Sequence, residues 1–123
     1  MKNLWDGVKG IIRRNGHILV LVKPNGTLDL PGGRIEDGET VQSALQREID
    51  EETGLEVEIH DSVKEWSFYK TPDRLIKGVT FECPYLEGSV KLCSEHKGYF
   101  WAAIDNIKRL NFNRNFLQNR NAA

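Results

Sequence analysis

Cysteine and proline are both scarce in this 123-residue sequence, which contains two cysteines and four prolines. A small disulfide scaffold is therefore excluded, because two cysteines in a chain long enough to bury a core are more often free thiols. No run approaches the roughly 20 apolar residues that span a bilayer. No uninterrupted apolar segment near the N-terminus has the form of a signal peptide. We expect a cytoplasmic protein with reduced thiols and no membrane partner.

Strong charge imbalance is also absent, since the formal net charge is -1. Hydrophobic residues make up 39% of the chain and charged residues 28%, as in ordinary globular proteins, so neither disorder nor a fibrous repeat is indicated. No repeat or linker divides the sequence, and its length suits a single domain over residues 1–123. The composition implies no specific nucleic-acid partner, and it leaves a homodimer open.

The near-neutral total conceals an acidic segment at residues 34–52. This segment holds seven acidic and two basic residues, a net charge of -5, whereas the rest of the chain is mildly basic. Such a patch suits cations. Most acidic runs are solvent-exposed helix faces. The spacing of the acids therefore has to decide whether this segment binds a cation or is only such a face.

The hydrophobic pattern predicts short strands around one clear helix. The helix is expected at 41–53, with Thr40 as its N-cap and Gly54 as the left-handed residue that ends it. Ser43 stands where a capping box has Glu or Gln, so we expect the reciprocal box to be absent. A turn is predicted at 14–16 and a terminal helix at 113–120. The strands are expected at 8–13, 17–23, 27–30, 56–69, 76–86 and 99–104. Together these elements predict an α/β protein with a mixed sheet covered on both faces.

The acids of the predicted helix occupy positions that amphipathicity alone does not explain. At about 100° per residue, the apolar stripe that begins at Val41 and Leu45 continues onto Glu48 and Glu52. Ionised carboxylates beside a core-facing stripe are costly through desolvation and mutual repulsion unless a cation neutralises them. With Glu51 beside the pair, we predict a site for a hard divalent ion, Mg²⁺ or Mn²⁺. The alternative is that these are ordinary surface glutamates.

The surrounding motif decides against that alternative. Read from Gly33, the sequence GRIEDGETVQSALQREIDEETGL resembles the Nudix box, GX5EX7REUXEEXGU with U aliphatic, at every specified position. The box spans residues 33–55. The matching residues are Gly33, Glu39, Arg47, Glu48, Ile49, Glu51, Glu52, Gly54 and Leu55. The resemblance implies the Nudix fold, an α/β/α sandwich with a central mixed β-sheet.

The resemblance also implies roles for individual residues. By matching position, Glu48, Glu51 and Glu52 would be the metal ligands. Gly32 matches a residue whose backbone carbonyl often completes the metal shell, and a side chain there would crowd that approach. Arg34 resembles the basic residue that meets substrate phosphate.

Three further residues outside the ligand set receive roles by the same comparison. Glu39 and Arg47 resemble the residues that fix the loop and orient the metal glutamates. Glu95 lies in a polar loop similar to the one that often supplies a general base, and we predict it as base or additional ligand, with an exposed bystander equally open. His96 and His60 are expected to be surface histidines.

The implied activity is metal-dependent hydrolysis of a phosphoanhydride bond in a nucleoside diphosphate derivative, by water attack on phosphorus. The main alternative is a non-catalytic Nudix-fold module that senses a nucleotide, which would be expected to lose the box carboxylates. The isomerase and antimutator-glycosylase branches of the superfamily generally have larger chains. All three carboxylates are intact here, which favours the hydrolase.

The substrate stays open at this level. Many relatives have an aromatic residue shortly before the PGG, but residues 27–31 contain none. Trp66, Phe68 and Tyr69 are candidates for a base-stacking wall, although aromatics in alternating strand positions are more often core. Base-edge hydrogen bonds from a region near the last helix are a weaker alternative, the candidates being Asn111, Asn113 and Asn115.

Overall fold

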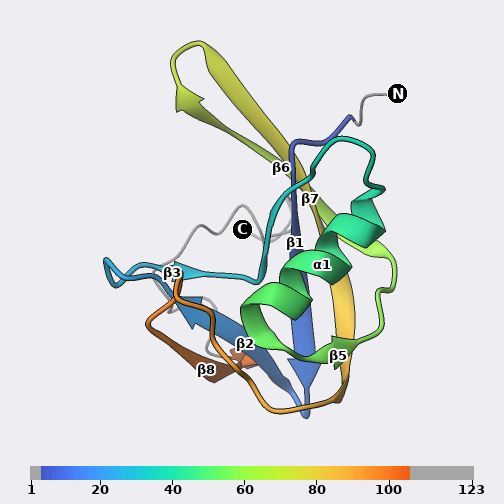
Figure 1. The fold of residues 1–123 in the computed structure, drawn as a ribbon, viewed down its shortest axis with the longest axis vertical. Coiled ribbons are helices and arrows are strands. Elements are labelled where there is room, and N and C mark those ends of the chain that lie inside the picture. The colour runs from blue at the N-terminus through green and yellow to red at the C-terminus, as the bar shows by residue number, and fades with distance from the viewer. Residues whose placement is uncertain (1–3, 106–123) are drawn as a thin grey trace.

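The computed structural model describes residues 4–105, which form one helix and an eight-stranded sheet (Figure 1). The helix is α1 (Val41–Thr53). The strands are β1 (Gly7–Arg14), β2 (His17–Val22), β3 (Leu28–Asp29), β4 (Gly32–Arg34), β5 (Glu56–Val57), β6 (Ser62–Thr71), β7 (Arg74–Glu87) and β8 (Gly98–Ala103). The predicted helix 113–120 and the three candidate asparagines lie outside the described residues. Within the described part, no helix is long and apolar enough to cross a membrane.

The sheet is mixed, as the sequence predicts. Its main path runs β3-β2-β1-β7-β5, with β1 parallel to β7 and antiparallel to β2. Three further strands pair off this path: β4 with β1, β6 with β7 and β8 with β2. Helix α1 lies across the middle of the sheet (Figure 1), where Leu45 and Ile49 share a core with Ile12 and Val79. This packing fixes the helix face that carries Glu48 and Glu52.

The first hairpin, between β1 and β2, forms at the predicted turn at 14–16. Asn15 and Gly16 have φ angles of 48° and 74°, the left-handed pair that a two-residue turn between twisted strands requires. Both cysteines are free, as expected. Burial raises the pKa of the Cys83 thiol to about 12, so this side chain behaves as an apolar core residue.

Two strand expectations need correction. The predicted strand 56–69 is divided into β5 and β6, because the chain between them bonds irregularly to β7 through Glu58 and His60 and the pairing register shifts. The glycine-rich segment before α1, where no strand is predicted, contains β4, which pairs antiparallel with β1. Two glycines leave no hydrophobic pattern, so pairing with β1 alone defines this strand.

The ends of α1 are fixed by local hydrogen bonds. The Thr40 hydroxyl accepts from Ser43 N at 3.0 Å, and Ser43 Oγ accepts from Thr40 N at 3.0 Å. The expectation that the reciprocal box is absent is therefore wrong, because a serine hydroxyl reaches back as a glutamate would. Gly54 ends the helix with φ 69°, as predicted.

Candidate metal centre and substrate pocket

Glu52 lies in the last turn of α1 and is only 6% exposed. Gly32 N, on β4, donates a hydrogen bond of 3.0 Å to its Oε1. Gly32 itself has φ 141°, and an added Cβ would lie 2.1 Å from Val8 O. A glycine is therefore needed here by the backbone of β1, a reason different from the crowding of a metal that we expected.

Glu48 lies one turn before Glu52 and packs against Gly33. An added Cβ at Gly33 would come within 2.7 to 2.8 Å of the Glu48 carboxyl group, so the missing side chain makes room for it. Burial raises the pKa of Glu52 to about 8, and the Gly32 bond and Lys9 only partly oppose the rise, while Glu48 adds to it. Two adjoining carboxyls, one of them buried, form the arrangement that a divalent cation would neutralise.

Arg47 connects the helix to the preceding loop. Its Nε and Nη2 donate to the two Glu39 carboxylate oxygens at 2.7 and 3.0 Å, and its Nη2 also donates to Arg34 O at 3.1 Å. Its Nη1 donates to Glu48 Oε1 at 2.9 Å. The bond from Arg47 holds the pKa of Glu39 at about 2. These contacts connect Glu39, through Arg47, to Glu48, one of the predicted metal ligands, and the role of Arg47 and Glu39 in orienting such ligands stays a prediction.

Glu51 is the most exposed of the three helix glutamates, with 59% of its side chain accessible. Its Oε2 lies 3.5 Å from Arg47 Nη1. Across residues 4–105, no three histidine, cysteine or acidic side chains are already gathered into a metal site. Glu48 and Glu52 thus adjoin each other, whereas Glu51 is exposed beside Arg47, and the role of all three as metal ligands stays a prediction.

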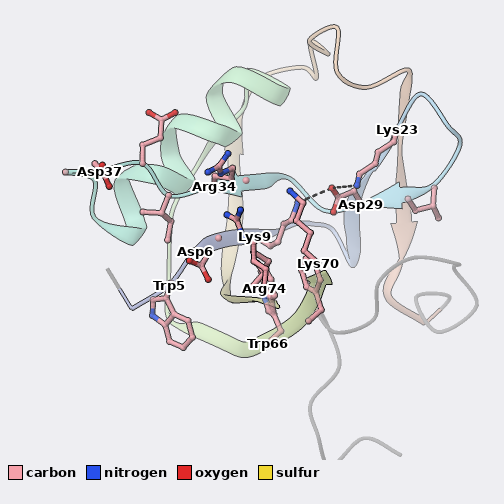
Figure 2. A pocket seen from close by; sticks show the side chains of 18 residues that line it. Trp5, Asp6, Lys9, Lys23, Asp29, Arg34, Asp37, Trp66, Lys70 and Arg74 are labelled. Atoms are coloured by element: carbon pink, nitrogen blue, oxygen red, sulfur yellow. Dashed lines mark hydrogen bonds and ion pairs between the residues drawn. The ribbon is translucent and has the colours of Figure 1, made fainter. Parts of the chain in front are cut away.

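A hollow of about 520 Å³ lies between the loop after β4 and the β6–β7 hairpin (Figure 2). Arg34 and Gly33 form part of its wall, as do Trp5 and Asp6 near the N-terminus. The helix glutamates are not wall residues, but Gly33 separates the hollow from the Glu48 carboxyl group. Arg34 is thus placed to meet an anion that enters beside the candidate metal ligands.

A buried ion pair in this hollow was missed by the sequence analysis. Lys9 Nζ donates to Asp29 Oδ2 at 3.0 Å and to Leu30 O at 3.1 Å, and both charged side chains are 11% exposed. Lys23 Nζ lies 3.6 Å from the same carboxylate oxygen (Figure 2). A lysine inside the apolar run of β1 was the available signal. Its partner is 20 residues away, and no local pattern identifies it.

Two of the three candidate aromatics lie in the hollow. Trp66 and Phe68 stack with centroids 6.0 Å apart and an interplanar angle of 16°. Trp66 is fixed because its Nε1 donates to Thr80 Oγ1 at 3.0 Å. Tyr69 is 69% exposed and is not a wall residue. The sequence ranking of these aromatics as core is therefore correct for the burial of Trp66 but overlooks its place in the pocket.

The loop between β7 and β8 carries Glu95, which is exposed. Its neighbour His96 is half-buried, so the expectation of a surface histidine is wrong there. Burial lowers the pKa of His96 against the opposing effect of Asp29, and its buried Nδ1 has no hydrogen-bond partner within the described residues. His60 is exposed beside Glu58, as expected. The role of Glu95 stays a prediction.

Known proteins resemble this chain over most of its length. It is 33% identical over 98 residues to a MutT-like protein from Streptomyces ambofaciens, covering 79% of this chain and 62% of that protein. It is 34% identical over 113 residues to an ADP-ribose pyrophosphatase from Methanocaldococcus jannaschii, covering 85% and 65%. The chain therefore spans less than two thirds of the length of these relatives.

Solved structures of other proteins share the fold of this chain. The crystal structure of a MutT protein from Methanosarcina mazei superposes with a TM-score of 0.77 at 28% identity, covering 85% of this chain and 80% of that one. Residues 5–119 match the family model described as NUDIX domain. Because that match takes in nearly the whole sequence, the chain belongs to the Nudix family.

Proposed function

We propose that this chain is a metal-dependent pyrophosphohydrolase that cleaves a phosphoanhydride bond in a nucleoside diphosphate derivative. Glu48, Glu51 and Glu52 would hold Mg²⁺ or Mn²⁺, with the Gly32 carbonyl as a further oxygen donor. When bound, the metal would polarise phosphate oxygens and lower the pKa of water. The observation that carries the proposal is the pair formed by the buried Glu52 and the half-buried Glu48, which adjoins Gly33 in the wall of a pocket that contains basic side chains.

The other residues would orient the substrate and the ligands. Arg34, exposed on the pocket wall, would bind a phosphate oxygen of the substrate, and the guanidinium suits such an anion geometrically. Arg47, held by Glu39, would keep Glu48 turned toward Gly33. Glu95 would accept the proton of the attacking water or add one more oxygen ligand. The products would be a nucleoside monophosphate and a phosphorylated second group.

A substrate panel tests this function. The purified protein would be incubated with Mg²⁺ and, separately, with nucleoside triphosphates, ADP-ribose, dinucleoside polyphosphates and nucleotide sugars, and the products resolved by chromatography. We expect cleavage at a phosphoanhydride bond in at least one class, with a nucleoside monophosphate among the products. If compounds of the panel bind but none of them is hydrolysed, the result would instead identify a nucleotide-sensing module.

A further inference from the structure

We propose that Asp6 is a positioning residue for the substrate, because its side chain fixes the β6–β7 hairpin against the start of β1 and so sets the width of the pocket. This inference rests on the proposed function, since it assumes that the substrate enters the hollow between the loop after β4 and that hairpin. Asp6 is an exposed wall residue of this hollow, next to Trp5 (Figure 2).

The β6–β7 hairpin leaves the body of the sheet at the level where β1 begins. The register of β1 and β7 starts with Gly7 opposite Gly78. Residues 74–77 of β7 lie before this level, and within the described part of the chain the strand that pairs with them is β6. The hairpin therefore projects from the sheet over this length (Figure 1). Because a two-stranded hairpin by itself is only marginally stable, contacts at its base decide where it lies.

Asp6 provides two hydrogen bonds at this base. Its backbone N donates to Lys77 O at 2.7 Å, and its Oδ2 accepts from Lys77 N at 2.9 Å. The carboxylate thereby extends the hydrogen bonding between β1 and β7 by one residue beyond Gly7. A hydrogen bond to a charged acceptor is stronger than one between neutral groups. The Asp6 side chain thus holds the projecting residue that lies nearest the sheet.

The main chain of Asp6 is bonded to the opposite wall of the pocket. Its carbonyl oxygen accepts from Ile35 N at 3.0 Å. Ile35 follows Arg34, the predicted phosphate-binding residue, and both are wall residues. One residue is therefore bonded to both walls, to the loop after β4 through its carbonyl group and to the hairpin through its carboxylate.

The projecting part of the hairpin supplies much of the far wall. Its wall residues are Phe68, Lys70, Arg74 and Ile76. A change in the direction of the hairpin would move these side chains together. Helix α1, with the candidate metal ligands, belongs to the body of the sheet and would stay in place. Loss of the carboxylate contact should therefore weaken substrate binding more than it slows the chemical step.

Two substitutions separate the hydrogen bond of Asp6 from its charge. Asp6→Ala removes both, whereas Asp6→Asn removes the charge and keeps a side-chain oxygen that can accept from Lys77 N. With a substrate that the panel identifies, Asp6→Ala should raise KM about fivefold or more and keep kcat within about twofold. Asp6→Asn should keep both constants near their wild-type values.

Asp73→Ala is the matched control, because Asp73 is exposed in the turn of the same hairpin and is not a wall residue. This variant should behave like the wild type. An equal rise of KM in Asp6→Asn or in Asp73→Ala would overturn the inference.

Amide hydrogen exchange tests the cause of the effect without turnover. The Lys77 N–H should exchange faster in Asp6→Ala than in the wild type and in Asp6→Asn, while the protection of α1 stays unchanged. A raised KM without faster exchange at Lys77, or faster exchange with an unchanged KM, would contradict the positioning role.

Binding of uncleavable nucleotides separates failure of this inference from failure of the proposed function. Affinities would be measured calorimetrically in Mg²⁺ for the 5′-(α,β-methylene)diphosphates of adenosine, guanosine, cytidine and uridine. We expect at least one to bind the wild type, and Asp6→Ala to bind it about fivefold or more weakly. If the substrate panel shows hydrolysis but Asp6→Ala equals the wild type in KM and affinity, only the inference fails. If the panel shows no hydrolysis while Asp6→Ala weakens binding, only the proposed function fails. If the wild type neither hydrolyses the panel nor binds these compounds, both fail.

Discussion

The Glu52 carboxyl group stands where an amphipathic helix would place an aliphatic side chain. Its burial and its closeness to Glu48 oppose ionisation, whereas Gly32 N and Lys9 favour it. A divalent cation would reverse this balance, because it attracts both carboxylates at once. Glu52 therefore reports on metal binding more directly than the exposed Glu51.

Replacing Glu52 separates its chemical role from its structural one. Glu52→Gln keeps the side-chain volume and removes the charge, so turnover should fall by orders of magnitude while the fold is kept. The measurement is the steady-state rate together with the circular dichroism spectrum. Asp50→Asn is the control, because it removes the charge of an exposed side chain on the same helix. This variant should keep normal turnover. Near-normal turnover in Glu52→Gln would show that the ligand assignment is wrong.

Glu95 is assigned by resemblance and by its exposed loop, so its role needs a kinetic test. If it deprotonates the attacking water, Glu95→Gln should lower the maximal rate by roughly 10² to 10⁴ and leave substrate affinity within a few fold. If it holds an additional metal, the loss should shrink as Mg²⁺ is raised. An unchanged rate at every Mg²⁺ concentration would remove Glu95 from the site.

The β6–β7 hairpin gives Trp66 its position through a glycine on the neighbouring strand. Gly78 pairs with Trp66, and an added Cβ would lie 2.2 Å from the indole ring. Gly78→Ala should therefore displace the ring and destabilise the protein by about 1 to 3 kcal/mol. Near-ultraviolet circular dichroism and denaturant unfolding measure these effects. Gly98→Ala on β8, where a Cβ meets Val22 at an ordinary 3.9 Å, should be tolerated. Equal effects of the two changes would argue against the proposed packing.

Elements with local signals could be predicted from the sequence, whereas elements defined by pairing could not. The Asn15 and Gly16 turn and the Gly54 helix end each require a backbone conformation that these residues adopt readily. By contrast, β4 is formed because it meets β1, and its two glycines carry no strand signal. The division between β5 and β6 likewise depends on the register of β7.

The candidate site likewise combines features with a local sequence signal and features that depend on contacts between distant strands. The burial of Glu52 and the partial burial of Glu48 could be predicted from one helical stripe, because both lie on a single local element. The Lys9 and Asp29 pair joins different strands, and Lys70 and Arg74 line the pocket only because the β6–β7 hairpin faces it. Local sequence cannot reveal these contacts because they depend on how the sheet is assembled.

At the scale of the whole molecule, the two shifted carboxyl groups make stability depend on pH in opposite ways. The pKa of Glu52 is about 8 in the folded protein against an ordinary value of 4.5. The folded state therefore binds this proton more tightly, and the metal-free protein should lose stability, on the order of a few kcal/mol, as pH rises from 4.5 through 8. The pKa of Glu39 is lowered to about 2, so its contribution is present above pH 4.5 and is lost as pH falls toward 2.

Thermal unfolding in chelator checks this expectation. The melting temperature of the wild type should fall between pH 5 and pH 8, and Glu52→Gln should show a smaller fall because its side chain does not titrate. Mg²⁺ should raise the wild-type melting temperature at pH 8, since it binds the ionised pair in the folded state. Identical pH dependence in the two proteins would contradict the burial argument for Glu52.

The metal dependence of hydrolysis tests the central claim most directly. With the substrate found in the panel, the rate would be measured after exhaustive chelation and again during stepwise return of Mg²⁺ or Mn²⁺. The carboxylate pair on α1 predicts that turnover vanishes in excess chelator and returns with the added ion, while Glu52→Gln regains little at the same concentration. Full turnover of the wild type in excess chelator would contradict the account.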